Sequence, residues 1–278
     1  QPVRGLQNAI LNSNFIGKIL KKSLGISTKR VLPKLEKIKI NSLYDSCIKK
    51  NNTKTVYLFI DEFSFYSETH IVKHSFALLT RLGYTIKTLP FSPSGRTYLS
   101  KGFLEQAKKL ASKNTKLYSK VIKAKTPLLF IEPSALYCFT DEYLKLIDDK
   151  KAGEQLAENC LSIGSFIARE SKTQKIISEQ FHKATKTVKF HAHCYQKALG
   201  NPADTFTMLN LPQNYTVKMI NSGCCGMAGS FGYEADHFEL SMKIGEERLF
   251  PAIRKSNSET LIAANGTSCR HQIKDGTQ

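Results

Sequence analysis

The sequence predicts an α/β fold with two similar lobes, each a small parallel sheet flanked by helices, preceded by a basic helical N-terminal segment. Three observations support this prediction. Short apolar runs typical of buried strands alternate with stretches of helical periodicity, a pattern that favours parallel sheets. The same order of runs occurs twice along the chain. The length of 278 residues is enough to bury a core in one large or two smaller domains.

Residues 1–54 predict a basic lead-in that is helical in part. They contain twelve Lys or Arg and two acidic residues, and so carry +10 of the formal charge of +18. Such a segment could dock on an acidic partner or an anionic membrane surface, or form a solvated basic face. Nucleic acid is not an expected partner, because the basic stretch lacks interleaved aromatic residues and shows no recognised nucleic-acid-binding motif.

The first lobe is predicted over residues 55–150. Its expected elements, in chain order, are strand 56–60, helix 68–82, strand 84–89, helix 102–124 and strand 128–131. Residues 151–187 contain no chemical motif and predict a helical connector. The second lobe, over residues 188–278, repeats the pattern. Its expected elements are strand 188–192, strand 216–220, helix 233–250 and strand 260–264.

The two lobes align with offsets of 131 to 134 residues, which predicts an internal duplication. Four cysteines of the second lobe follow its strands. Their counterparts in the first lobe are Glu62, Pro93, Ser94 and Ala135. None of these residues can supply a thiolate. We therefore expect the first lobe to have lost any metal site and to serve as scaffold.

The four cysteines of the second lobe are Cys194, the adjacent pair Cys224 and Cys225, and Cys269. Because the carboxyl ends of neighbouring parallel strands meet at one edge of a sheet, we expect the four sulfurs to lie together there. Four thiolates in one place suit an iron–sulfur cluster or a zinc ion. The sequence has no Cys-x-x-Cys, a spacing more common for zinc, and this favours an iron–sulfur cluster.

Other interpretations of these cysteines remain open. They could be buried core thiols, Cys224 and Cys225 could form a vicinal disulfide, or zinc could bind with His191 and His193 completing a mixed site. For the two histidines, a position beside the cluster is preferred, and ordinary hydrogen-bonded histidines are the further alternative. The isolated cysteines are expected to pack as small hydrophobic side chains; they are Cys47, Cys138 and Cys160.

Several classes are not supported by the sequence. It contains no Ser-His-Asp set, P-loop or Gly-x-Gly-x-x-Gly loop, and no catalytic residue is proposed within the chain. No apolar run approaches the roughly 18 residues of a membrane span. The first residues lack the order of a signal peptide, and clustered thiols favour a reducing compartment such as the cytoplasm. Because the chain begins with Gln1, we expect it to be part of a longer protein.

Residues 223–234 resemble the signature of the cysteine-rich CCG domain. That domain occurs in a subunit of heterodisulfide reductase, in the glycolate oxidase iron–sulfur subunit and in a subunit of anaerobic glycerol-3-phosphate dehydrogenase. Residues 191–199 and 266–273 are most similar to one branch, the C-terminal part of FAD/FMN-containing dehydrogenases of the D-lactate/2-hydroxyacid type. The resemblance covers nearly the whole chain, with specific motifs in the second lobe and faint ones in the first.

This resemblance implies electron transfer from a flavin through iron–sulfur clusters to a quinone or another acceptor. The implied partners are the flavin (FAD) and ferredoxin-like domains of the same longer polypeptide or complex, with the inner face of a membrane as a further surface. By motif match, the cluster ligands would be Cys194, Cys224, Cys225 and Cys269. The surrounding residues would be His191, His193, Gly223, Gly226 and Arg270.

The sequence departs from the family pattern at three points. Gly266 stands where many members begin a Cys-x-x-Cys, so a four-thiolate [4Fe–4S] site is expected rather than a five-thiolate one. Tyr195 replaces a histidine common in this branch, and the first lobe lacks its cysteines. An isolated fragment could lose the cluster or hold zinc in its place. The alternative functions are a zinc-stabilised or metal-free docking module and thiol chemistry of the heterodisulfide reductase kind.

Overall fold

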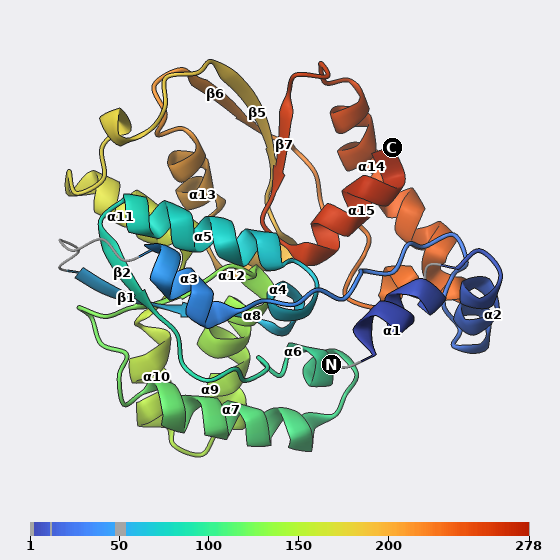
Figure 1. The fold of residues 1–278 in the computed structure, drawn as a ribbon, viewed down its shortest axis with the longest axis horizontal. Helices are drawn as coiled ribbons and strands as arrows, with labels where there is room; N and C mark the ends of the chain where they lie inside the picture. The colour runs from blue at the N-terminus through green and yellow to red at the C-terminus, as the bar shows by residue number, and fades with distance from the viewer. Residues whose placement is uncertain (1–2, 12, 48–53, 278) are drawn as a thin grey trace. The chain divides into compact units, whose positions relative to one another are not determined.

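The computed structural model describes residues 3–11, 13–47 and 54–277, and it consists of two compact units, each built around one sheet (Figure 1). The first-sheet unit comprises the described residues of 38–184 and 195–215. The second-sheet unit comprises the described residues of 1–37, 185–194 and 216–278. Both units therefore consist of segments that are distant in the sequence.

The first-sheet unit contains a four-stranded parallel sheet. Its strands are β1 (Lys54–Phe59), β2 (Tyr84–Lys87), β3 (Leu128–Phe130) and β4 (Cys160–Ser162), in the order β2-β1-β3-β4. In the register, Val56 lies opposite Ile86 and Phe59 opposite Phe130. Strand β4 lies beside β3, with Cys160 opposite Leu128. Residues 151–187, predicted as a helical connector, thus contribute a strand to this sheet.

The two faces of this sheet are both buried, as expected for parallel strands whose connections are helices. Alternate residues of β1 point to opposite sides, so Leu58 packs with Phe76 of α5 while Phe59 packs with Tyr118 of α7. The helices of this unit are α3 (Ile40–Cys47), α4 (Glu62–Tyr66), α5 (Thr69–Arg81), α6 (Arg96–Ser100), α7 (Leu104–Tyr118), α8 (Pro133–Tyr137), the π-helical turn η1 (Cys138–Glu142), α9 (Tyr143–Leu146), α10 (Lys150–Ala157), α11 (Ile163–Lys172), the 3-10 turn η2 (Ser178–Gln180), α12 (Cys194–Leu199, from its second residue) and α13 (Pro202–Leu209).

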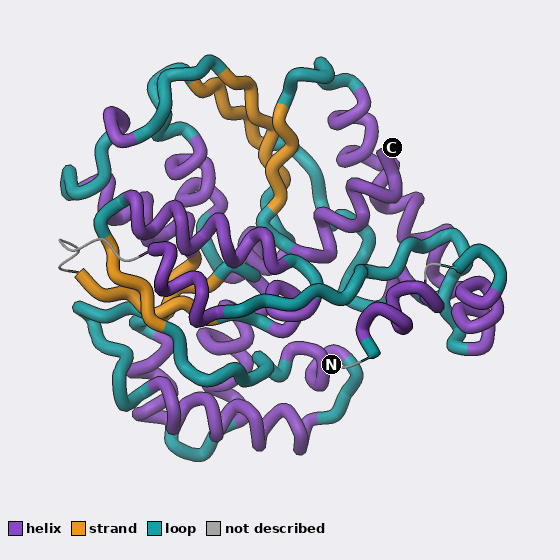
Figure 2. The backbone as a smooth tube through the Cα atoms, viewed as in Figure 1, coloured by secondary structure: helices purple, strands orange, loops and turns teal. Residues whose placement is uncertain are grey.

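The second-sheet unit contains a three-stranded sheet in the order β6-β5-β7. Strands β5 and β7 are parallel, and His191 at the end of β5 lies opposite Ala264 at the end of β7. Its elements are α1 (Arg4–Leu11), α2 (Ile16–Ser23), β5 (Lys186–His191), β6 (Tyr215–Met219), the 3-10 turns η3 (Phe231–Tyr233) and η4 (Ala235–His237), α14 (Phe238–Arg254), β7 (Leu261–Ala264) and α15 (Thr267–Thr277). Figure 2 shows that residues 220–230, the cysteine loop, contain neither helix nor strand.

The sheets of the two units share one strand order. β2-β1-β3 in the first matches β6-β5-β7 in the second, as the predicted alignment of the lobes requires. The predicted fold class, with two small parallel sheets flanked by helices and helices in the N-terminal segment, is confirmed. The assignment of 1–54, 55–150, 151–187 and 188–278 as separate domains stays a prediction.

The N-terminal segment divides between the two units. Residues up to 37 belong to the second-sheet unit, where Ile26 forms an antiparallel bridge with Glu234 and the Ser27 amide donates to the Tyr233 carbonyl at 2.8 Å. Residues from 38 onward, including α3, belong to the first-sheet unit. None of the helices in the described ranges is both long and apolar enough to cross a membrane.

Candidate metal centre

The four predicted cysteine ligands all lie in the second-sheet unit, beyond the carboxyl ends of its strands. Cys194 is the first residue of α12 and follows β5 by three residues. Cys224 and Cys225 lie in the cysteine loop after β6, and Cys269 is the third residue of α15 after β7. Cysteines in the first turn of a helix are favoured as thiolates, because free backbone N–H groups and the helix dipole stabilise negative charge there.

Three of the side chains form a compact buried group. One ring nitrogen of His191 and the sulfurs of Cys225 and Cys269 all lie within 4.8 Å of one another. Each of these residues is at most 3% exposed. Cys194 and Cys224 are partly buried. The six cysteines whose side chains the structure describes are all free, so no disulfide ties any pair of them together.

The sulfurs form a chain of neighbours from Cys194 through Cys224 and Cys225 to Cys269. Hydrogen bonding to Cys194 and Cys225 lowers the pKa of Cys224, and the Gly226 amide also donates to its sulfur at 3.3 Å. Contact with Cys224 and Cys269 raises the pKa of Cys225. The pKa of Cys269 is lowered, first by Cys225 and then by His191. Cys224 and Cys269 thus favour the thiolate form, whereas Cys225 is held as a thiol by its two neighbours, and a metal cation beside it would favour its ionisation.

His191 is oriented by a residue that the sequence analysis did not single out. Its Nδ1 lies 2.8 Å from the hydroxyl of Ser222, which fixes the imidazole ring. Its Nε2 is buried and makes no hydrogen bond of ordinary geometry within the described residues, but the Cys269 thiol lies close enough for His191 to lower the pKa of that thiol. A ring nitrogen beside two thiols suits a metal ion. In the sequence, the only indication of a role for Ser222 is its position two residues before Cys224.

His193 accounts for the glycine at position 266. A Cβ on Gly266 would lie 2.3 Å from Cδ2 of the His193 ring, so no larger residue fits there. The Nδ1 of His193 is 3.9 Å from the sulfur of Cys194. His193 therefore packs directly against Gly266, and the expected number of thiolate ligands stays a prediction.

The two glycines beside the cysteine pair differ in their surroundings. Gly226 has φ of +94°, and a Cβ on it would lie 2.2 Å from the carbonyl oxygen of Ser241. Both the backbone conformation and the packing therefore require glycine. A Cβ on Gly223 would meet no protein atom within 4 Å. Protein packing therefore does not require a glycine at position 223.

Arg270, predicted to lie beside the centre, anchors the end of a strand. Its guanidinium donates to the carbonyl of Ala264 and to the hydroxyl of Thr267, both at 3.0 Å. These bonds hold the turn between β7 and α15, the helix that carries Cys269.

The donor set fits a metal group. Sulfur and imidazole ligands suit zinc, copper and iron–sulfur clusters rather than magnesium or calcium. The buried His191, Cys225 and Cys269 group could therefore bind a metal, with Cys224 and Cys194 next along the chain of sulfurs. Cys138 and Cys160 are buried in the first-sheet unit, as expected for small hydrophobic side chains; the side chain of Cys47 lies outside the described residues.

The first-sheet unit has carboxylates at the corresponding edge. Glu62 and Ser94, which align with Cys194 and Cys225, are in direct contact. The two carboxylate oxygens of Glu62 accept hydrogen bonds from the amide and the hydroxyl of Ser94, both at 2.9 Å. A carboxylate thus binds the loop in this unit where thiols gather in the other. The expected absence of thiolates at these four positions follows from the sequence.

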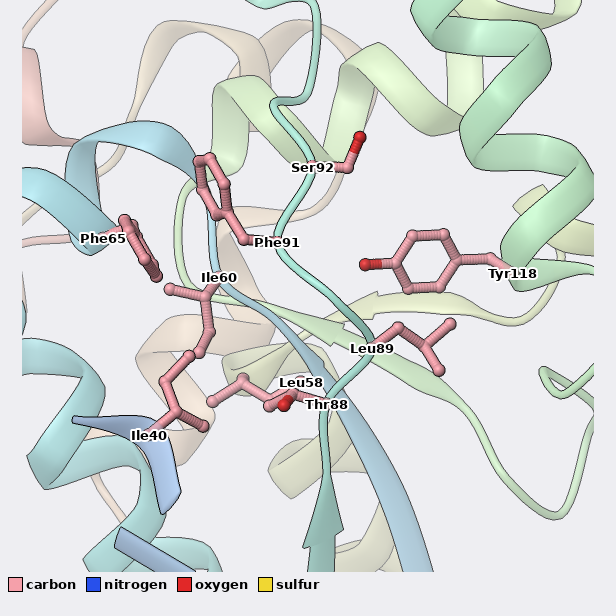
Figure 3. A pocket seen from close by; sticks show the side chains of 9 residues that line it. All are labelled: Ile40, Leu58, Ile60, Phe65, Thr88, Leu89, Phe91, Ser92 and Tyr118. Carbon is pink, nitrogen blue, oxygen red and sulfur yellow. The ribbon is translucent and has the colours of Figure 1, made fainter. Parts of the chain in front are cut away.

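A small pocket also lies in the first-sheet unit, beyond the carboxyl ends of β1 and β2 (Figure 3). Its empty space is about 230 Å³, part of it open to solvent. The rings of Phe65 and Phe91 stack with their centres 4.2 Å apart. The buried hydroxyl of Ser92 has no hydrogen-bond partner among the described residues. The lining residues are Ile40, Leu58, Ile60, Phe65, Thr88, Leu89, Phe91, Ser92 and Tyr118. They include no carboxylate, imidazole or thiol, so the pocket offers no obvious metal or acid–base chemistry.

Comparison with known proteins places this chain among relatives of oxidoreductases. No protein-family model matches the sequence. The D-2-hydroxyglutarate dehydrogenase of Pantoea ananatis is 29% identical over 218 residues, which are 77% of this chain and 20% of that protein. The enzyme of the same name from Escherichia coli K12 is 26% identical over 278 residues, 96% of this chain and 26% of that enzyme. The chain is therefore similar to a segment of D-2-hydroxyglutarate dehydrogenases.

A second class of relative matches nearly the whole chain. A subunit of the anaerobic glycerol-3-phosphate dehydrogenase of Escherichia coli K12 is 21% identical over 280 residues, 99% of this chain and 69% of that subunit. The chain spans about a fifth to a quarter of the D-2-hydroxyglutarate dehydrogenases it matches. Distant similarity to a 2-hydroxyacid dehydrogenase and to this dehydrogenase subunit is confirmed. Membership of the CCG-domain family stays a prediction.

Proposed function

We propose that this chain is the electron-transfer portion of a flavin-dependent 2-hydroxyacid dehydrogenase and that its second-sheet unit holds a [4Fe–4S] cluster. The proposed ligands are Cys194, Cys224, Cys225 and Cys269. The observation that carries the proposal is the buried group of His191, Cys225 and Cys269, which Cys224 and Cys194 extend as a chain of neighbouring sulfurs beyond the ends of the strands. The similarity to D-2-hydroxyglutarate dehydrogenases supports the reaction class.

The residues of the unit have separable roles in this proposal. A bound [4Fe–4S] cluster supplies one-electron transfer. Cys225 and Cys269 bind from the buried side, while the partly exposed Cys194 and Cys224 face the route by which electrons would enter or leave. The Gly226 amide, 3.3 Å from the Cys224 sulfur, donates a hydrogen bond that stabilises the charged form. Burial of the centre limits access of water and oxygen.

The remaining steps belong to other parts of a longer protein or complex. Oxidation of a hydroxy acid by FAD would take place outside this chain, and a ferredoxin-like domain would pass electrons to it. A quinone or another acceptor would take them up. The coverage of about a fifth to a quarter of the D-2-hydroxyglutarate dehydrogenases supports this division of labour. The six free cysteines suit the reducing cytoplasm, with a membrane surface as a site of attachment.

The decisive experiment is anaerobic purification followed by measurement of iron, acid-labile sulfide and zinc on one sample, with EPR of the reduced protein. We expect about four irons and four sulfides per chain. Cys224→Ser should abolish cluster assembly, because it removes a ligand. Cys160→Ser is the matched control, since Cys160 is buried in the first-sheet unit. Full iron and sulfide content in Cys224→Ser would contradict the ligand assignment.

A zinc-stabilised docking module is the second candidate, and one observation favours it. A ring nitrogen of the buried His191 lies within 4.8 Å of the sulfurs of Cys225 and Cys269, and it could complete a mixed zinc site. Stoichiometric zinc without sulfide, persisting after attempted cluster reconstitution, would favour this function. His191→Ala separates the two, because it should remove zinc but leave a four-thiolate cluster assembled.

A further inference from the structure

Arg30 is the largest side chain that is fully buried in the described part of the chain. It lies in the basic N-terminal segment, within the second-sheet unit. Burying an arginine is costly unless its charge is paired and its N–H groups are hydrogen-bonded. The proposed function assigns no role to this residue. Its contacts therefore need an explanation of their own.

The guanidinium of Arg30 bonds to three parts of the second-sheet unit. Its Nη1 donates to a carboxylate oxygen of Asp275 at 2.8 Å, and its Nε donates to the Gly232 carbonyl at 2.7 Å. Its Nη2 donates to the Ser241 hydroxyl at 3.0 Å. The guanidinium also lies 4.9 Å from the centre of the Phe238 ring, a favourable cation–π arrangement. These contacts join η3, α14 and α15.

Two of these partners also support the segment that follows the cysteine pair. The amide of Gly232 donates to the Met227 carbonyl at 2.8 Å and closes the turn from Met227 to Gly232, which directly follows Gly226. The carbonyl of Ser241 packs so closely on Gly226 that a Cβ would not fit between them. The position of Gly226, directly after Cys225, therefore depends on two residues that Arg30 contacts.

The same network reaches the helix that carries Cys269. The side-chain amide of Gln272, which is fully buried, donates to the carbonyl of Ser241 at 2.9 Å and to its hydroxyl at 3.2 Å. Gln272 lies three residues after Cys269 on α15, and Asp275 lies one turn further on. Arg30 thus contacts α15 directly through Asp275 and indirectly through Ser241.

We propose that Arg30 is a positioning residue for the metal centre: its guanidinium ties the segment after Cys225 to the helix that carries Cys269 and so fixes the spacing of these two sulfurs. This inference rests on the proposed metal-binding function. It gives the N-terminal segment a specific role, which is to supply the cation that holds the cysteine-bearing segments together. The sulfurs themselves do not contact Arg30 in this proposal.

The test compares Arg30→Met with Lys29→Met in the anaerobically reconstituted full chain. Lys29 is a matched control, because it is the adjacent cation, is 64% exposed at its side chain and pairs with Glu239 at the surface. We expect Arg30→Met to release iron to a chelator about tenfold faster than the unmodified chain. Its EPR spectrum should also change, because the sulfurs no longer hold their spacing. Lys29→Met should stay within about twofold of the unmodified chain.

Hydrogen exchange of the metal-free protein provides a readout that does not require a cluster. In Arg30→Met, amides of residues 226–232 and 267–272 should exchange about tenfold faster, while amides of β5 remain unchanged. If even the unmodified chain assembles no cluster, the proposed function fails, and the exchange comparison still decides the role of Arg30.

A second variant covers the case in which Arg30→Met does not fold. Ser241→Ala removes one of the three hydrogen-bond partners of the guanidinium and leaves the charge in place. It should release iron about threefold faster than the unmodified chain. The amides of residues 226–232 and 267–272 should also exchange faster in this variant. Unchanged iron release, EPR spectrum and exchange in a folded Arg30→Met or Ser241→Ala protein would overturn the proposal.

Discussion

Asp61 is a buried carboxylic acid just beyond the end of β1, and it caps helix α4. One of its oxygens accepts hydrogen bonds from the amides of Phe63 and Ser64, and the other accepts one from the Ser64 hydroxyl. Burial, followed by the charge of nearby Glu132, raises the pKa of Asp61 to about 7. The amide and hydroxyl hydrogen bonds act in the opposite direction but do not cancel the effect of burial.

The stability of the first-sheet unit should therefore depend on pH. An acid whose pKa is higher in the folded chain stabilises the fold fully below its unfolded pKa of 3.8, and this contribution is lost as the pH rises through about 7. Between about pH 5 and about pH 8, the free energy of unfolding should fall by about 2 to 3 kcal/mol. Urea unfolding at the two pH values measures this difference.

Asp61→Asn should flatten that dependence. The asparagine keeps an oxygen acceptor for the helix cap but cannot ionise. Asp148→Asn is a suitable control, because the Asp148 side chain is 84% exposed and pairs with Lys108 at the surface. An Asp61→Asn protein with the same pH dependence as the unmodified chain would show that another group carries the effect.

Arg30 illustrates what could not be predicted at the scale of single residues. In a segment with twelve basic and two acidic residues, an arginine is expected on a solvated face. Its three partners lie 202, 211 and 245 residues away in the sequence. No local pattern reveals such contacts. The four cysteines could be predicted as one site because each follows a strand whose apolar run is visible in the sequence.

Among the elements, the cysteine loop depends on its glycines in two different ways. Gly226→Ala should lower the free energy of unfolding of the second-sheet unit by about 1 kcal/mol or more, because of its positive φ and the adjacent Ser241 carbonyl. Gly223→Ala should leave unfolding of the metal-free protein unchanged, since no protein atom lies near the added Cβ. Urea unfolding, monitored by hydrogen exchange of amides in β5, measures both effects. Equal losses of unfolding free energy in Gly226→Ala and Gly223→Ala would contradict the different roles of the two glycines.

The strands were predictable wherever a continuous apolar run marks them. Residues 56–60 and 188–192 indicated β1 and β5 to within two residues. Strand β4 was missed, because its three residues, Cys160–Ser162, lie directly between two helices and form no apolar run of strand length. The helix expected to begin at residue 233 begins at Phe238 instead, after two 3-10 turns. Tertiary contacts of Tyr233 with the N-terminal segment decide that boundary.

For the whole molecule, the central contrast is that two sheets of the same strand order carry different chemistry at the corresponding edge. In the first-sheet unit, the carboxylate of Glu62 accepts hydrogen bonds from the amide and the hydroxyl of Ser94 in the corresponding loop. The second-sheet unit gathers thiols, and the pKa of one of them, Cys225, is raised by its neighbours Cys224 and Cys269, so a metal cation would favour its ionisation. Only the second-sheet unit should therefore depend on metal.

Metal removal should reveal this contrast directly. We expect chelation to increase the hydrogen-exchange rates of amides in β5 and β7, because bound metal stabilises only the unit that holds it. The exchange rates of amides in β1 and β3 should change by no more than about twofold. Exchange measured by mass spectrometry before and after anaerobic chelation tests this expectation. Equal destabilisation of both sheets would instead indicate that the units unfold as one.

The distribution of the second-sheet unit along the chain also has a consequence for biosynthesis. The ribosome adds the carboxylate that neutralises Arg30, that of Asp275, 245 residues after Arg30 itself. The first-sheet unit, in contrast, is complete once residue 215 has been added. The proposed ligands therefore reach their final arrangement, and would take up a metal, only after Asp275 has been added.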